Sequence, residues 1–129
     1  MKVYFAASWA LREKMREYRA ELASMGGDVT SRWIDSEDVT GMKHEDVVAD
    51  PQRAIAGATL DLSDIDAAEM VVIFTEVPST TGGLHFEFGY AWGNDKMVVV
   101  IGPQPNVFFS LVGNAHFPDW DTFVAWWVR

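Results

Sequence analysis

Apolar residues occur along this chain in patterns that predict different secondary structures. Short runs over 2–7, 70–74 and 96–101 are apolar almost throughout, which is typical of strands buried in a parallel sheet. Over 29–34 the apolar residues stand at alternate positions, which predicts one more strand. These segments supply the inner strands of the predicted sheet.

The segments after the first two strands predict a helix and a loop. Ser8 stands where a helix cap is needed, and apolar residues at helical spacing follow it as far as the glycines at 26–27. The segment 35–50 is polar and poorly periodic. We therefore predict a surface loop with a helical turn there.

Three further helices are predicted. Asp50 and Pro51 read as an N-cap followed by proline at the first helical position. The helix that they begin is expected to break near Gly57 and to resume beyond it. The remaining helices are predicted over 84–93 and 119–128, the last of them amphipathic.

The alternation of strands and helices predicts one domain over residues 1–129. Its fold is expected to be a three-layer α/β/α sandwich with a mostly parallel five-stranded sheet, of the flavodoxin or Rossmann-like kind. Ligands of such sheets bind beyond the carboxyl ends of the strands. Ser8 and Trp9, the loop 78–87 and the segment 102–106 all follow strands, so we expect them to gather at one edge.

Composition narrows the function classes. The formal net charge of −9 argues against binding of nucleic-acid polymers, although a helix start can still hold a small nucleotide. The absence of cysteine excludes disulfides and thiolate metal sites, and the histidines show no metal-site spacing. We find no glycine-rich cofactor fingerprint, signal peptide or membrane span, so we expect a cytoplasmic protein without cofactor, metal or membrane partner.

Glu87 is the most informative residue, because it places a carboxylate in an otherwise apolar and aromatic run over 82–92. Such a group must be desolvated, paired or functional. If the helix begins at 83 or 84, Glu87 lies in its first turn, where the macrodipole would keep it ionised and able to attack. Helix capping is the alternative, but Leu84 cannot complete a capping box. Both readings stay open at this point.

Three aspartates precede the third strand, at positions 61, 64 and 66. Asp61 and Asp64 share a helical face, and two carboxylates at one pocket are the equipment of glycosidic chemistry. For Asp64 and Asp66 we favour a solvated helix surface, while Asp61 stays a candidate. His85 lies two residues from Glu87 and so on another helix face, which favours a hydrogen-bonded structural role.

Three motifs resemble the nucleoside 2-deoxyribosyltransferase family, which includes nucleoside monophosphate N-glycosidases. They are Val-Tyr-Phe-Ala-Ala-Ser-Trp at 3–9, Asp-Leu-Ser-Asp-Ile at 61–65 and Glu-Phe-Gly-Tyr-Ala at 87–91. The resemblance extends over about residues 3–110. It implies cleavage of the N-glycosidic bond of nucleosides or their 5′-monophosphates, with the sugar transferred to another base or to water.

The resemblance also implies roles for individual residues. Glu87 matches the nucleophile that forms a covalent glycosyl-enzyme, and Tyr4 matches the tyrosine that orients it. Asp61 matches an aspartate that assists departure of the base, and Trp9 resembles an aromatic wall of the base site. Asn106 resembles an asparagine that reaches into a neighbouring subunit's site, which implies a homodimer or higher homo-oligomer with shared active sites.

One position departs from the family pattern. Many deoxyribosyltransferases carry an aspartate six residues before the nucleophile, where this chain has Thr81. The hydroxyls and amides of the loop 79–83 can instead hold a 5′-phosphate. A non-catalytic nucleotide-binding or sensor module therefore remains the alternative function. The full set of predicted substrate-binding residues is Ser8, Trp9, Thr81, Gly83, His85 and Asn106.

Overall fold

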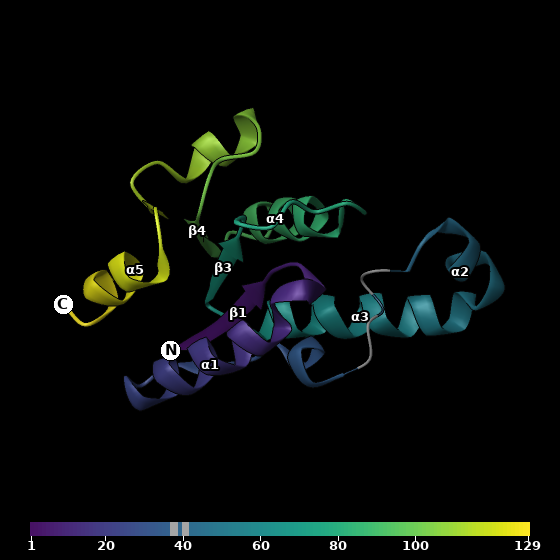
Figure 1. Cartoon of the computed structure of the whole chain (residues 1–129), viewed down its shortest axis with the longest axis horizontal. Coiled ribbons are helices and arrows are strands. Elements are labelled where there is room, and N and C mark those ends of the chain that lie inside the picture. Colours follow the sequence, from purple (N-terminus) through teal and green to yellow (C-terminus); the bar gives the residue numbers. More distant parts are fainter. Residues whose placement is uncertain (37–38, 40–41) are drawn as a thin grey trace.

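Five strands form one parallel sheet in the computed structural model, which describes residues 1–36, 39 and 42–129 (Figure 1). The strands are β1 (Lys2–Ala6), β2 (Asp28–Val29), β3 (Met70–Phe74), β4 (Met97–Ile101) and β5 (His116–Phe117). The α-helices are α1 (Arg12–Ser24), α2 (His44–Ala49), α3 (Pro51–Ala67), α4 (Gly83–Gly93) and α5 (Trp120–Trp127). Three short 3₁₀ helices are η1 (Trp9–Leu11), η2 (Arg32–Asp35) and η3 (Val107–Val112).

The strand order is β2-β1-β3-β4-β5, with every neighbouring pair parallel. In this doubly wound order, successive strands are added on one side of β1 as far as β2 and then on the other side from β3 onward, so the order reverses between β1 and β3. Helices cover both faces, so the predicted three-layer α/β/α fold is confirmed. The reversal point opens a crevice at the carboxyl ends of β1 and β3, where the candidate site lies.

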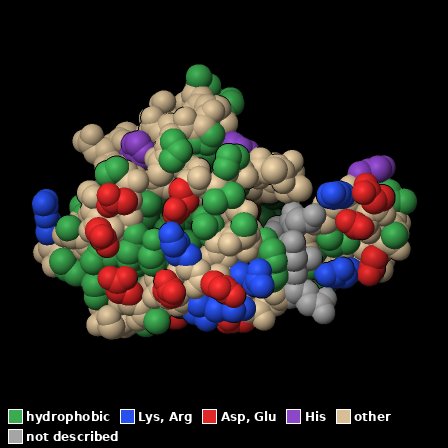
Figure 2. All heavy atoms as spheres, in the orientation of Figure 1, with side chains coloured by type: hydrophobic (Ala, Val, Ile, Leu, Met, Phe, Trp, Pro, Cys, Tyr) green, Lys and Arg blue, Asp and Glu red, His purple; other side chains and the backbone are tan. Residues whose placement is uncertain are grey.

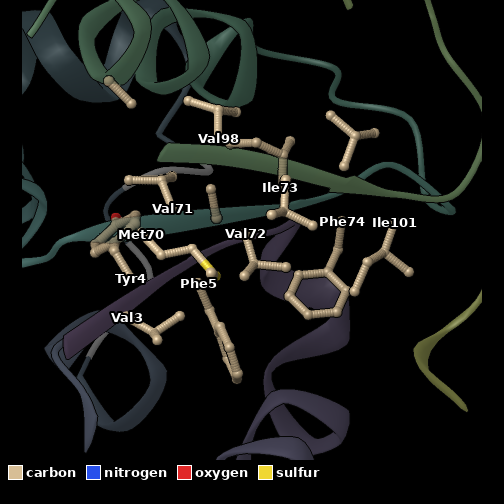
Figure 3. Packing of buried hydrophobic residues seen from close by; sticks show 14 of the residues in the cluster. Val3, Tyr4, Phe5, Met70, Val71, Val72, Ile73, Phe74, Val98 and Ile101 are labelled. Atoms are coloured by element: carbon tan, nitrogen blue, oxygen red, sulfur yellow. The ribbon is translucent and has the colours of Figure 1, made fainter. Parts of the chain in front are cut away.

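Successive residues of β1 belong to opposite layers of the core, as the period of a strand requires (Figure 3). Phe5 packs edge-on against Phe74 and Trp120, on the side covered by α1 and α5. Tyr4 points to the other side, where its hydroxyl meets Glu87 of α4. Both β1 side chains are fully buried.

The predicted strand over 29–34 is mostly wrong. β2 ends at Val29, and the chain turns into η2. Side chains replace the strand ladder there: the Ser31 hydroxyl accepts the Phe5 N–H at 2.6 Å, and the Trp33 indole donates to the Phe5 carbonyl at 2.7 Å. Ser31 and Trp33 therefore face β1 through side chains that bind its backbone, without strand pairing.

The helix that begins at Pro51 runs without the predicted break at Gly57. Asp50 caps it as expected, accepting the N–H of Arg53 at 3.2 Å. Gly57 is needed for close packing: a Cβ there would lie 2.5 Å from a methyl carbon of Val39. In the predicted loop 35–50 the helical turn is α2, while positions 37, 38, 40 and 41 lie outside the described residues. No helix in the described ranges is long and apolar enough to cross a membrane.

Candidate active site

A buried tyrosine–glutamate pair forms the centre of the site. The Tyr4 hydroxyl, on β1, donates a hydrogen bond to Oε2 of Glu87, on α4. The two residues are 0% and 8% exposed. Because α4 begins at Gly83, Glu87 is its fifth residue and lies beyond the first turn. From the sequence we expected it within the first turn.

The protonation state of Glu87 also differs from the expectation. Burial raises its pKa to about 8, although the Tyr4 hydrogen bond lowers it and the nearby Asp61 charge raises it further. The pKa of Tyr4 is raised well above its ordinary value, by burial first and the Glu87 charge second, so Tyr4 remains a neutral donor. In the ligand-free protein at neutral pH, Glu87 is therefore mainly protonated, because desolvation outweighs the Tyr4 hydrogen bond.

Asp61 lies on α3 and is half-buried. Burial raises its pKa to about 6, and the negative charge of Asp64 adds to the effect. Because the charge of Asp61 also acts on Glu87, the two carboxyl groups titrate as a coupled pair. Between about pH 6 and pH 8 this pair holds one proton.

Two adjoining cavities meet at Asp61. The larger, of about 480 Å³, is lined by Trp9, Trp33, Ser36, Val39, Arg53, Ala56, Gly57, Leu60 and Asp61. The smaller, of about 250 Å³, is lined by Val39, Met42, Val47, Ala54, Gly57, Ala58, Asp61, Leu62, Gly83, Phe86 and Glu87. Glu87 lines the smaller cavity, and the rings of Trp9 and Trp33 line the larger one. Asp61 lines both, so it stands at their junction.

Two tryptophans form a wall of the larger cavity. The rings of Trp9 and Trp33 lie 6.4 Å apart at 46°, and the Arg12 guanidinium sits 4.6 Å from the centre of the Trp9 ring. Ser8 caps η1 by accepting the Ala10 N–H at 3.4 Å, which sets the start of the turn that carries Trp9. Trp33 is absent from the predicted site residues. The alternating pattern over 29–34, in which Trp33 stands two positions after Ser31, is the sequence feature that could have indicated it.

The loop before α4 leads to a helix start that lines the smaller cavity. Gly83, the first residue of α4, lines that cavity, and Thr81 is exposed two positions earlier. The Ser79 hydroxyl accepts the Gly82 N–H at 3.2 Å, so a loop hydroxyl already faces the amides at the helix start.

His85 and Asn106 lie together in a third hollow, of about 400 Å³, and line neither of the two adjoining cavities. Asn106 Nδ2 is hydrogen-bonded to His85 Nδ1 at 3.4 Å, and the His85 ring meets Phe109 edge-on at 5.6 Å. His85 makes a hydrogen bond, as expected, and its predicted contact with substrate stays a prediction. Within one chain, neither residue is brought to Glu87.

The other two aspartates of α3 have different surroundings. Asp66 is exposed, as expected, and accepts the Tyr90 hydroxyl at 2.7 Å. Asp64 is 4% exposed, so its predicted solvated position is wrong. Arg32 binds its carboxylate through the backbone and the guanidinium. Over the described residues, no cluster of three or more acidic or histidine side chains could hold a metal ion.

Comparisons with known proteins show a similarity in structure and none in sequence family. No family model and no curated protein matches this chain. Among solved structures, the fold is similar to the Clostridium botulinum CMP N-glycosidase BcmB, with a TM-score of 0.59 and 15% sequence identity. The match covers 97% of this chain and 96% of the other. At this identity the likeness establishes a shared fold, which agrees with the three-layer α/β/α fold predicted from the alternation of strands and helices.

Proposed function

We propose that this protein cleaves the N-glycosidic bond of nucleosides or nucleoside 5′-monophosphates through a covalent intermediate on Glu87. The observation that carries the proposal is the buried Tyr4–Glu87 pair, which opens into a cleft shared with Asp61. The shared fold with a CMP N-glycosidase supports the same class of bond. Membership of the nucleoside 2-deoxyribosyltransferase family remains part of this proposal.

The two cavities divide the substrate between them in this proposal. The sugar occupies the smaller cavity above Glu87, and the base occupies the larger one against Trp9 and Trp33. The glycosidic bond then lies beside Asp61, which lines both cavities. A 5′-phosphate would meet the amides at the start of α4, near Gly83.

In the ligand-free protein the single proton of the pair lies mainly on Glu87, and the chemistry needs it on Asp61. Ionised Glu87 attacks C1′, while the C1′–N bond breaks with its electron pair moving to the base. Asp61 gives its proton to the departing base and becomes a carboxylate able to take a proton from water. The water then attacks C1′ and releases Glu87, or a second base does so and the sugar is transferred. The Tyr4 hydrogen bond favours the ionised form of Glu87.

We further propose that two copies of the chain associate through the surface formed by α4 and η3. The segment 101–118 has no Lys, Arg, Asp or Glu, and Figure 2 shows the region over η3 without charged side chains on that face. Trp92 and Phe108 are 43% and 65% exposed there. A chain with a net charge of −9 repels its own copies least through such a surface. Sedimentation should show a dimer that Phe108→Glu converts to monomer, and a natural protein that sediments as a monomer would contradict the proposal.

Incubation with a panel of nucleosides and 5′-monophosphates, followed by chromatography, tests the activity. We expect release of free base, or base exchange when an acceptor base is added. Glu87→Gln should abolish both, while Glu17→Gln, an exposed change of the same kind on α1, should not. Normal turnover by folded Glu87→Gln would refute the proposal. Saturable binding without any product would instead favour the nucleotide-binding module.

A further inference from the structure

Asp64 lies one helical turn after Asp61 and ties α3 to the segment that precedes Trp33. Its carboxylate accepts the Arg32 backbone N–H at 3.0 Å and Arg32 Nε at 2.9 Å, and Arg32 Nη2 pairs with it at 2.7 Å. Its backbone carbonyl accepts the Thr30 hydroxyl at 2.8 Å. The Asp64 side chain is 6% exposed and that of Arg32 is 60% exposed. The guanidinium therefore covers a buried carboxylate.

The position of Trp33 depends on this attachment. The strand ladder between β1 and β2 ends before this segment, so strand pairing does not hold it. Two side-chain contacts to Phe5 hold it, together with the hydrogen bond from the Arg32 N–H to Asp64. Arg16 adds a hydrogen bond to the Ile34 carbonyl at 3.0 Å, on the other side of Trp33. Trp33 is the next residue, and its ring forms part of the larger cavity.

We propose that Arg32 and Asp64 are a positioning pair for the candidate active site. They hold Trp33 as a wall of the larger cavity, and Arg32 holds the Asp64 carboxylate in place one turn from Asp61. The proposal rests on the proposed function only where Asp61 is given a proton to donate. Neither Arg32 nor Asp64 lines the two cavities, so both act through other residues.

The second half of the role concerns the charges around Asp61. Within the described residues these groups are Tyr4 on β1, Glu87 on α4, and Asp64 and Arg53 on α3. The Arg32 guanidinium of η2 is paired with Asp64 and offsets part of its charge. After burial, the charge of Asp64 is the cause that raises the pKa of Asp61. A carboxyl group that keeps its proton to higher pH is a better acid at neutral pH.

The charge role is tested on the protein without substrate, by following the Asp61 carboxyl carbon by NMR during a pH titration. Asp64→Asn keeps an acceptor for the Arg32 N–H and removes the charge. Asp66→Asn removes the same charge from an exposed position on the same helix. We expect the pKa of Asp61 to fall by on the order of one unit in Asp64→Asn and by much less in Asp66→Asn. Equal shifts in both variants would overturn the charge role.

The positioning role is tested by kinetics. Trp33→Phe removes the indole donor to Phe5, and Arg32→Lys keeps the positive charge but loses the fork that grips Asp64. Each change should raise KM about fivefold, the cost of one hydrogen bond, and leave kcat nearly unchanged. An unchanged KM in both variants would overturn this role. If the natural protein releases no base, the proposed function fails, and the NMR titration still decides the charge role.

Discussion

Glu87→Gln is expected to stabilise the protein, and the gain should grow with pH. Burial raises the pKa of Glu87 from its ordinary value of 4.5 to about 8. Between these values the unfolded chain has released a proton that the folded chain still holds, so the free energy of unfolding falls as pH rises. Glutamine has nearly the same shape, can accept the Tyr4 hydroxyl and has no proton to lose.

The size of the effect follows from the pKa difference. Each unit is worth about 1.4 kcal/mol, so the full interval corresponds to about 5 kcal/mol. By pH 7 the natural protein has lost about 3 kcal/mol of this stability. The structural reason for so large an effect is that Glu87 is only 8% exposed, so solvent screens little of its charge.

Urea unfolding of both proteins measures the effect at about pH 5.5, 7 and 8.5. These values lie above the isoelectric point of about 4.6, where precipitation is a risk. The free energies of the two proteins should diverge by about 3 kcal/mol across this range, while exposed Glu17→Gln should follow the natural protein. A constant difference between Glu87→Gln and the natural protein would refute the reasoning that burial controls the proton on Glu87.

Three further predictions concern the site and its support. Tyr4→Phe removes a hydrogen bond that lowers the pKa of Glu87, so the one proton of the pair lies still more on Glu87 and less on Asp61. The value of kcat/KM at neutral pH should therefore fall about tenfold or more, and an unchanged value would contradict this. Asp61→Asn should abolish the falling limb of kcat/KM near pH 8, where the pair loses its last proton, and base release should slow most for bases that are poor leaving groups. Gly102→Ala should cost at least about 2 kcal/mol of stability in thermal unfolding, because Gly102 has φ of +115° and a Cβ there would lie 2.6 Å from the Thr75 hydroxyl. A melting temperature equal to that of the natural protein would contradict this last expectation.

The sheet and most of the helices could be predicted because their signals are local. Apolar runs mark β3 and β4, and Asp50 before Pro51 marks the start of α3. The prediction failed over 29–34, where the same alternation arises from Ser31 and Trp33 binding the backbone of β1 with their side chains. Periodicity cannot distinguish that arrangement from strand pairing.

Asp61 and Asp64 show why the site could be predicted only in part. Both lie on one face of α3, and the sequence gives them equal chemistry. The tertiary structure gives Asp64 a guanidinium partner and places Asp61 beside two cavities. The two residues differ because Arg32, which is far from both along the chain, pairs with Asp64.

The sequence by itself determined that a carboxylate, Glu87, stands in an apolar helix after the third strand, because composition and spacing are local properties. Only the tertiary structure decided what surrounds it. Folding brings Glu87 against Tyr4, 83 positions away, and close enough to Asp61 for their charges to interact. Burial and neighbouring charge set the affinity of a carboxyl group for its proton, and both depend on contacts between distant parts of the chain.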